Sequence, residues 1–287
     1  MSATAEAPDI RRPTSIAEAV AALGDGIRPI IAGATWIMRA PTRGEALPRT
    51  GVLVGGIPDL TRIDVEPKGL AIGAGVNHAA LADALADLPE FQGLATAAAK
   101  SAKPSIRSVA TVGGNLCATA FAASDLAPQL LCLDATVNYA TAAGTQTMPL
   151  ERFLAARATL DGGLLTAIHV PRGAFRSAHA RLPLRKAGDY PVAIVSLAAM
   201  LGGGKLAGLR VAVGSVEATA RRWTRLESAL EGSPLDPAAA AQRAAGLTGD
   251  FSPRDGIEAP AWYRTKVLPT LVRKAFEDLA AQMVEPT

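Results

Sequence analysis

The stretch Ala110-Thr111-Val112-Gly113-Gly114-Asn115-Leu116 decides how this chain is interpreted, together with the segment Ser124-Asp125-Leu126-Ala127-Pro128 that follows it. Two adjacent glycines let the backbone approach a ligand without a Cβ in the way, and their N–H groups can donate to phosphate oxygens. Asn115 adds a hydrogen-bonding side chain and Asp125 a carboxylate. The combination favours a nucleotide site, with donors for a pyrophosphate and an acceptor for a ribose or ribityl hydroxyl.

A second candidate loop lies upstream, where the apolar run Pro29-Ile30-Ile31 leads into Ala32-Gly33-Ala34-Thr35. Two such loops in one chain predict a bound dinucleotide. Taken alone, Asn115 is equally well a left-handed turn residue and Asp125 a helix cap. The coincidence of both loops with the Ser124-Asp125 pair and the basic-aromatic segment Arg185-Lys186-Ala187-Gly188-Asp189-Tyr190 favours binding.

Composition limits the class of protein. The chain has 287 residues, of which 49% are hydrophobic and 19% charged, as in a globular protein with a substantial core. The net charge of +3 comes from dispersed residues, without a basic run, so we expect no nucleic-acid partner. No uninterrupted apolar stretch is long enough to span a membrane and no signal peptide is visible, so we expect a cytoplasmic protein.

Other kinds of site find little support. Cys117 and Cys132 are the two cysteines, which excludes a disulfide framework and a zinc or iron–sulfur site of the usual ligand number within this chain. The histidines His78, His169 and His179 are far apart, so each is expected to be a surface or core residue. The segment 202–205 lacks the residues of a phosphate-binding P-loop and is interpreted as a hairpin turn.

Hydrophobic patterning divides the chain into three units. The first contains a helix over 14–23 and strands over 27–32 and 51–55. The second contains strands over 70–76, 137–140 and 164–170, with helices over 78–85, 91–102 and 126–133. The third begins near Phe175, with a hairpin of strands 192–201 and 206–213 and helices over 219–231, 237–247 and 260–283.

A series of short motifs resembles, in content and order, the FAD-binding (medium) subunits of molybdenum hydroxylases of the carbon monoxide dehydrogenase and xanthine dehydrogenase type. The likeness covers nearly the whole chain. Two departures stand out: Ala34 replaces a glycine of the first loop, and the stretch between Asn115 and Asp125 is one residue longer than usual. The matching motifs are Ser15-Ile16-Ala17-Glu18-Ala19, Ala32-Gly33-Ala34-Thr35, Ile72-Gly73-Ala74-Gly75-Val76, Ile106 to Asn115, Ser124 to Pro128, Arg185 to Tyr190, Val211-Ala212-Val213-Gly214-Ser215-Val216, and Tyr263-Arg264 to Leu271.

The resemblance implies an α+β fold in three parts. Residues 1–57 and 58–174 would form a two-part FAD-binding domain of the vanillyl-alcohol-oxidase-like type. Residues 175–287 would form a flavoprotein C-terminal α/β domain with a three-stranded antiparallel sheet and helices.

The implied function is electron transfer in a molybdenum hydroxylase complex. FAD on this chain would take electrons from two [2Fe–2S] clusters of a small iron–sulfur subunit and pass them to an external acceptor, while a large subunit carries the molybdenum cofactor. The complex would be a dimer of heterotrimers. Two other hypotheses stay open: a stand-alone FAD-dependent oxidoreductase of similar fold, and an assembly subunit that has lost flavin.

The resemblance also implies which residues bind FAD, and it assigns none to catalysis or to a metal. Ala32, Gly33, Ala34, Thr35 and Trp36, with Thr111, Gly113, Gly114 and Asn115, would hold the pyrophosphate through backbone N–H and threonine hydroxyl donors. Asp125 would accept a hydrogen bond from a cofactor hydroxyl. Lys186 would lie near the isoalloxazine and Tyr190 would cover one of its faces. Ile31, Ala102, Ser124, Leu165 and Arg181 complete the implied set.

Overall fold

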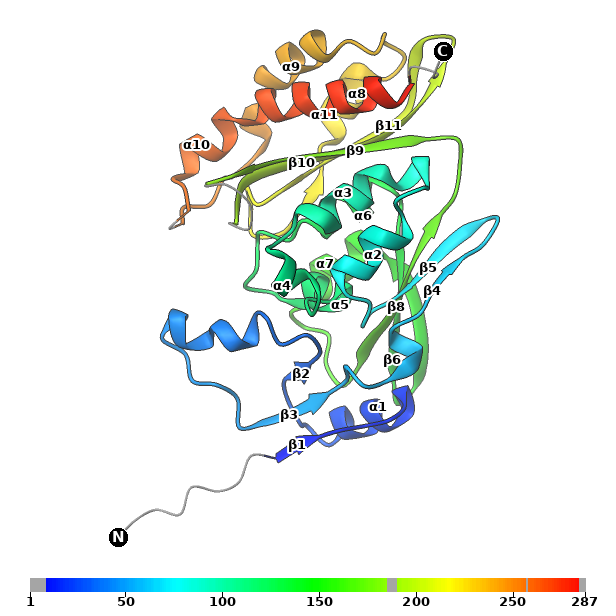
Figure 1. The fold of residues 1–287 in the computed structure, drawn as a ribbon. Coiled ribbons are helices and arrows are strands. Elements are labelled where there is room, and N and C mark those ends of the chain that lie inside the picture. Colours follow the sequence, from blue (N-terminus) through cyan, green and yellow to red (C-terminus); the bar gives the residue numbers. More distant parts are fainter. Residues whose placement is uncertain (1–8, 185–189, 257, 284–287) are drawn as a thin grey trace.

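Three β-sheets follow one another along the length of the molecule in the order of the sequence (Figure 1). The structure is a computed structural model, and it describes residues 9–184, 190–256 and 258–283. The first sheet is parallel and the other two are antiparallel. This arrangement confirms a mixed α+β fold.

The first unit is a small parallel sheet covered by one helix. Its strands run in the order β1-β3-β2. Ser15 caps α1, because its hydroxyl accepts a hydrogen bond from the Glu18 N–H at 3.2 Å. The strand expected over 27–32 is only two residues long, since Pro29 has no N–H to donate to a neighbouring strand. The elements are β1 (Asp9–Arg11), α1 (Ile16–Gly24), β2 (Ile30–Ile31), η1 (Ile37–Arg43) and β3 (Thr50–Leu53).

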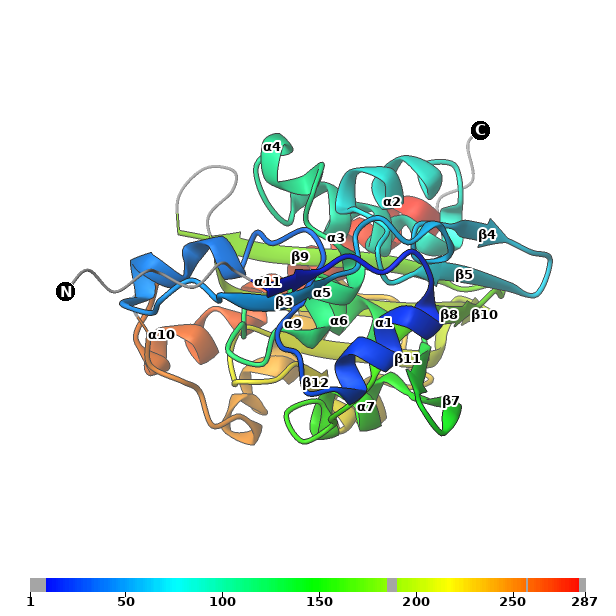
Figure 2. The ribbon, with the colours of Figure 1, turned by 90° about the horizontal axis from the view of Figure 1, so that it is seen from below.

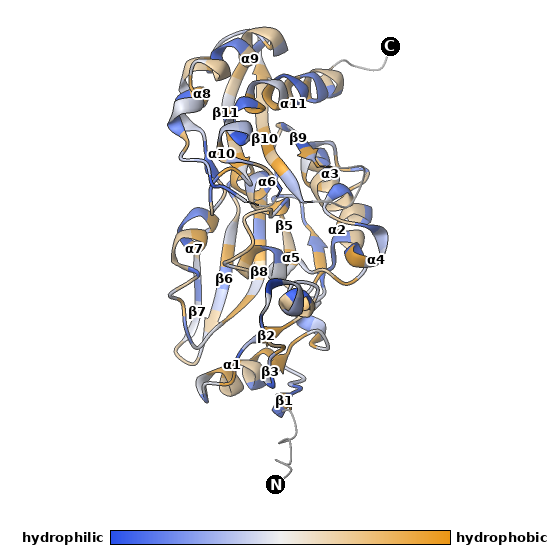
Figure 3. Cartoon of the chain, turned by 90° about the vertical axis from the view of Figure 1, so that its left-hand side faces the viewer, coloured by the Kyte–Doolittle hydropathy of each residue, from blue (hydrophilic) through white to orange (hydrophobic). Residues whose placement is uncertain are grey.

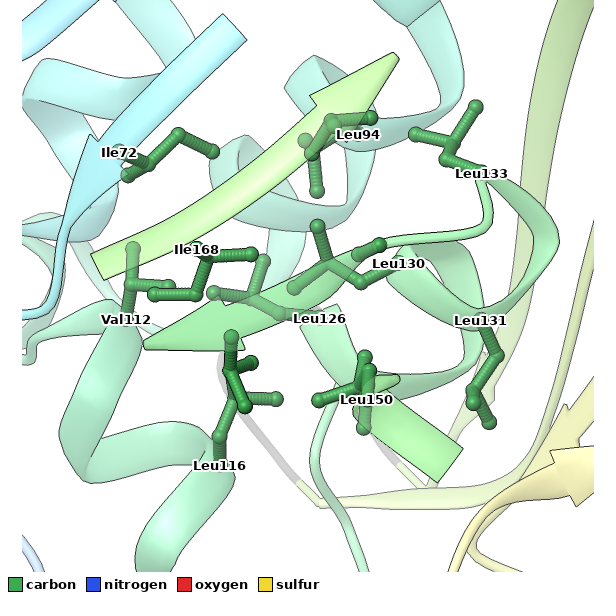
Figure 4. Close-up of a cluster of buried hydrophobic side chains, with 14 of the residues drawn as sticks. Ile72, Leu94, Val112, Leu116, Leu126, Leu130, Leu131, Leu133, Leu150 and Ile168 are labelled. Atoms are coloured by element: carbon green, nitrogen blue, oxygen red, sulfur yellow. The ribbon is translucent and has the colours of Figure 1, made fainter. Parts of the chain in front are cut away.

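The middle unit is a five-stranded antiparallel sheet in the order β4-β5-β8-β6-β7. Apolar side chains of β5 and β8 pack on those of the helices α5 and α6, as Ile72, Ile168, Val112 and Leu126 show in Figure 4. The strands are β4 (Ile63–Val65), β5 (Gly69–Gly73), β6 (Thr136–Thr141), β7 (Gly144–Pro149) and β8 (Leu164–Pro171). The helices are η2 (Pro58–Leu60), α2 (His78–Ala84), η3 (Pro89–Phe91), α3 (Gln92–Lys100), α4 (Pro104–Arg107), α5 (Val112–Cys117), α6 (Leu126–Cys132) and α7 (Leu150–Ala156).

The C-terminal sheet has four strands, in the order β12-β11-β10-β9, rather than the expected three. The additional strand is the pair Arg221–Arg222, which is too short to show a periodic pattern in the sequence. The expected hairpin of β10 and β11 is present, joined at Gly202 and Lys205. The elements are β9 (Arg176–Pro183), β10 (Pro191–Gly202), β11 (Lys205–Gly214), β12 (Arg221–Arg222), α8 (Thr224–Leu230), α9 (Pro237–Ala245), η4 (Thr248–Asp250), α10 (Ala261–Lys266) and α11 (Leu268–Met283).

Helices cover both faces of this C-terminal sheet. The helices α8, α9 and α11 lie on one face, and α3 and α6 of the middle unit lie on the other (Figure 1). Every residue of β10 from Pro191 to Ala199 is buried, and the strand is largely apolar in Figure 3, as expected where both faces are covered. The middle unit and the C-terminal sheet therefore share one packed layer.

A buried arginine in α10 forms hydrogen bonds that connect this helix to the C-terminal sheet. The side chain of Arg264 in α10 is fully buried, and its guanidinium donates to the carbonyl oxygens of Val192 at 2.7 Å and Ser215 at 3.0 Å. It also lies 3.1 Å from the Glu258 carboxylate. The single helix expected over 260–283 is divided before Leu268, because Pro269 cannot donate a helical hydrogen bond and so stands in the first turn of a new helix.

We expect the Arg264→Met variant to lose about 3–5 kcal/mol of unfolding free energy, because the substitution leaves the carbonyl oxygens of Val192 and Ser215 without their buried donor and weakens the pairing of the half-buried Glu258 carboxylate. Urea unfolding followed by circular dichroism measures the loss. The matched control is Arg273→Met, which removes an exposed pair with Glu277 on α11 and should change stability by less than about 0.5 kcal/mol. Equal unfolding midpoints for the two variants would contradict this role of Arg264.

Candidate functional site

A cleft of about 880 Å³ lies where the three units meet. Its wall includes the loop after β2, the turn into α5, the start of α6, the strand β8 and Tyr190. The segment η1 after β2 extends toward the side of the molecule where α10 lies (Figures 1 and 2). The sequence-predicted residues that line the cleft are Ala32, Gly33, Ala34, Thr35, Trp36, Ala102, Thr111, Gly113, Gly114, Asn115, Asp125, Leu165 and Tyr190.

Three predicted residues, Ile31, Ser124 and Arg181, stand apart from this wall. Ile31 lies in β2, Ser124 is buried behind Asn115, and Arg181 lies in β9 behind Asp125. Lys186 lies outside the described residues. Ser124 and Arg181 thus contact lining residues rather than the cleft itself.

The two loops predicted from the sequence lie against each other. A Cβ on Gly33 would overlap the carbonyl oxygen of Val109, and it would lie 3.2 Å from the Cα of Ala110. Only glycine therefore fits at this position. The neighbouring Ala34 has a φ of 55°, in the left-handed region that favours glycine, so the loop keeps a glycine-type conformation although alanine stands there.

The first loop offers a row of backbone donors to the cleft. Within the described parts of the chain, the N–H groups of Gly33, Ala34, Thr35 and Trp36 donate to no backbone or side-chain acceptor. Successive N–H groups of this kind form an anion-binding surface. This loop is suited to hold phosphate oxygens.

The second loop differs from the expectation that its N–H groups hold the pyrophosphate. Residues 112–117 form the short helix α5, capped by the Thr111 hydroxyl, which accepts from the Gly114 N–H at 3.1 Å. The Gly113 N–H donates to the Ala74 carbonyl at 2.7 Å, and the Asn115 N–H donates to the Thr111 carbonyl at 2.9 Å. A Cβ on Gly113 would lie 2.8 Å from the Ala74 side chain, so this glycine serves close packing.

Asn115 and Ser124 fix the start of α6. The Ser124 hydroxyl donates to Asn115 Oδ1 at 2.5 Å, and the Leu126 N–H donates to the same oxygen at 3.3 Å. Ser124 Oγ also accepts from the Ala127 N–H at 3.3 Å. These two side chains perform the capping that Asp125 would otherwise supply, so the Asp125 carboxylate is not used as the helix cap.

The Asp125 carboxylate is instead held by the C-terminal sheet. Arg181 Nε lies 2.8 Å from Asp125 Oδ1, and His179 Nε2 lies 3.5 Å from the same oxygen. Ser196 on β10 lies 2.9 Å from His179 Nδ1. All of these side chains are buried, so the carboxylate enters the cleft wall as part of a fixed polar network.

Sequence analysis missed His78, which lines the cleft at the start of α2. It is only 3% exposed, and its Nδ1 lies 2.7 Å from the Ser101 hydroxyl. Its Nε2 has no hydrogen-bond partner among the described residues. Burial lowers the pKa of His78 to about 4, so the ring is neutral near pH 7. The preceding Asn77, a helix cap, was the only sequence signal here.

An aromatic cluster at one side of the cleft was also missed in part. The Phe121 ring centroid lies 5.0 Å from that of Trp36 and 5.2 Å from that of Tyr190. The guanidinium of Arg39 lies over the Tyr190 ring, and that of Arg43 lies over the Trp36 ring. Phe121 belongs to the stretch that is one residue longer than usual, which was the available signal.

Comparisons with known proteins identify the family of this chain. The family model described as "FAD binding domain in molybdopterin dehydrogenase" matches residues 6–173, and "CO dehydrogenase flavoprotein C-terminal domain" matches residues 174–279. This chain belongs to the family of FAD-binding subunits of molybdenum hydroxylases. The resemblance found in the sequence is thereby confirmed.

Individual relatives cover most of the chain. The carbon monoxide dehydrogenase medium chain of Afipia carboxidovorans is 31% identical over 96% of this chain and 97% of its own. The glyceraldehyde dehydrogenase medium chain of Sulfolobus acidocaldarius is 29% identical, over 61% of this chain and 63% of its own. The structure of reconstituted CO dehydrogenase from Oligotropha carboxidovorans has a TM-score of 0.86 and 28% identity, covering 96% of this chain and 99% of that one.

The residues of the cleft fit the FAD that the family implies. The row of N–H groups at 33–36 suits a pyrophosphate, the buried Asp125 carboxylate suits a hydroxyl, and His78 Nε2 is a buried polar atom for which a ligand can supply a partner. Among the residues that the structure describes, no group of three or more His, Cys, Asp or Glu side chains could hold a metal ion. No helix in those ranges is long and apolar enough to cross a membrane.

Because His78 has a lower pKa in the folded chain than in the unfolded chain, the unfolded state binds the proton more readily between about pH 4 and pH 6.5. We therefore expect the contribution of His78 to the free energy of unfolding to fall by about 1.4 kcal/mol per pH unit as the pH falls through this window. Urea unfolding of the wild type and of His78→Gln at several pH values measures this slope. The difference between the two free energies should be constant above pH 6.5 and change steadily below it; parallel curves throughout would refute the assignment.

Proposed function

We propose that this chain carries FAD as the electron-transfer subunit of a molybdenum hydroxylase complex, taking electrons from [2Fe–2S] clusters on a partner and passing them to an external acceptor. The observation that carries the proposal is the joint occurrence, in one cleft, of four available backbone N–H groups and a clamped carboxylate. The family matches over 6–173 and 174–279 support it.

The first loop would hold the diphosphate. Its residues Gly33 to Trp36 line the cleft, and their N–H groups have no acceptor among the described residues. Binding of phosphate to these donors would therefore break no hydrogen bond between described residues. Asn115 and Gly114, at the facing turn, would close the other side of the diphosphate. Ile31 and Ser124 would support these two loops from behind.

Asp125 would accept a hydrogen bond from a hydroxyl of the cofactor. The carboxylate is 2% exposed and keeps its position through Arg181 and His179, so it is oriented before a ligand arrives. Preorganisation of this kind lowers the entropic cost of binding. Leu165 and Ala102 would supply apolar contact to the cofactor.

Tyr190 and Lys186 would act at the flavin ring. Tyr190 lies in the aromatic cluster with Phe121, and its guanidinium neighbour Arg39 holds its ring in place. We propose that Tyr190 covers one face of the ring, and that Lys186, which lies outside the described residues, places a cation near it. FAD, when bound, supplies the exchange between two-electron and one-electron transfer.

Partner subunits would provide the other redox centres. The relatives include a carbon monoxide dehydrogenase medium chain and the alpha subunit of a 6-hydroxypseudooxynicotine dehydrogenase complex, names that describe parts of multi-subunit enzymes. We propose that a large subunit carries the molybdenum cofactor and a small subunit two [2Fe–2S] clusters, in a dimer of heterotrimers.

Purification of the tagged chain from its own cells tests this assignment. We expect the visible absorption of oxidised flavin, together with molybdenum and iron in the copurified material, measured by elemental analysis. A colourless preparation would refute FAD binding. A yellow preparation free of both metals would refute the complex and favour a stand-alone FAD-dependent oxidoreductase.

The Asp125→Ala variant should bind FAD about ten- to a hundred-fold more weakly. The buried hydroxyl of the cofactor would lose the carboxylate that accepts its hydrogen bond, at a cost of about 1–3 kcal/mol. Equilibrium dialysis against FAD measures the dissociation constant. The control is Asp83→Ala, an exposed carboxylate on α2, which should leave the constant unchanged. Unchanged flavin retention by Asp125→Ala would remove Asp125 from the site.

A further inference from the structure

A second cavity, of about 360 Å³, opens beside the cofactor cleft between α3, α4, β9 and α11. Its lining carries the cationic side chains of Lys100, Arg107 and Lys274, with His179 and Arg181 at its inner wall. No Asp or Glu occurs among its lining residues within the described ranges. We call this cavity the basic groove.

Three cations of the basic groove have no acidic partner among the residues that the structure describes. Lys100, Arg107 and Lys274 take part in no ion pair in the portion of the chain that the structure describes. Arg107 donates to the carbonyl oxygens of Ala102, at 3.0 Å, and Ala99, which orient its guanidinium but do not neutralise it. Like charges gathered on one surface repel, and a bound anion removes that cost.

Local helix structure explains part of this arrangement. Lys100 stands in the last turn of α3 and Arg107 in the last turn of α4, where a cation interacts favourably with the helix dipole. Lys274 stands in the middle of α11, so its charge is not placed at a helix C-terminus. Its side chain is exposed, and it lines the groove across from two helices of another unit.

The basic groove adjoins the cofactor cleft directly. Ala102 lines both cavities. His179 and Arg181 form part of the groove wall, and both contact the Asp125 carboxylate, which lines the cleft. A ligand in the groove therefore lies next to the cofactor, with one carboxylate and its two partners between them.

We propose that the basic groove binds the phosphate group of a small molecule beside the cofactor cleft. A guanidinium and two ammonium groups suit phosphate oxygens, and the volume suits a small ligand. Phosphate binding in the groove does not depend on the proposed function. The phosphate group can be free or belong to a nucleotide, and the chemistry of recognition is the same.

Isothermal titration of the full chain, saturated with FAD, tests the groove with inorganic pyrophosphate. Saturation with FAD prevents the probe from binding in the cofactor cleft. We expect the double variant Lys100→Gln/Lys274→Gln to bind pyrophosphate at least ten-fold more weakly than the wild type, with unchanged flavin content. The control is Lys68→Gln/Lys205→Gln, which removes two exposed lysines elsewhere and should bind as the wild type does.

Equal affinities of the wild type and the groove variant, or no binding by the wild type, would overturn the proposal. A second titration with ADP identifies the source of the phosphate: tighter binding than pyrophosphate indicates a nucleotide, and equal binding indicates a free phosphate group. If the chain proves unable to bind FAD, the proposed function fails by itself. Pyrophosphate binding that the groove variant loses would then still support the groove.

Discussion

The close approach of two backbone segments at Gly33 is the constraint on which the site depends. A side chain there would overlap the Val109 carbonyl, so any other residue would push the first unit away from the middle unit. The contact brings residues 33–36 and Asn115 into the wall of one cleft. The absence of a Cβ at Gly33 thus allows the first and middle units, which have separate sheets, to approach closely and form part of the cleft wall.

The C-terminal sheet has a second, less evident effect on the cleft. Its edge strand β9 supplies Arg181 and His179, and these side chains hold the Asp125 carboxylate at the start of α6. The helix α6 in turn packs on β10 and β11 (Figure 1). Binding residues of the middle unit are therefore positioned by the following unit, and loss of packing in the C-terminal sheet would reach the cofactor through Asp125.

The two glycine-containing loops have different structural roles, although their sequences are similar. The first loop leaves its N–H groups available, whereas the second uses those of Gly113 and Asn115 inside the chain. In the second loop, Gly113 permits close packing of α5 on Ala74. The local sequence shows where a glycine stands. Whether that glycine permits ligand binding or close packing depends on which atoms lie near its Cα in the folded chain.

Ordered motifs in the sequence were sufficient to predict the family and most residues of the cleft lining. Local periodicity was sufficient to predict the order of most helices and strands. Sequence analysis failed where distant segments decide the outcome. The strand β12 exists only through pairing with β11, Phe121 packs on Trp36 and Tyr190 of the other two units, and His78 is held beside Ser101, 23 residues further along the chain. The basic groove belongs to the same class, since Lys100 and Lys274 are 174 residues apart and meet only in the fold. Long-range packing sets such neighbours, and no short stretch of sequence records them.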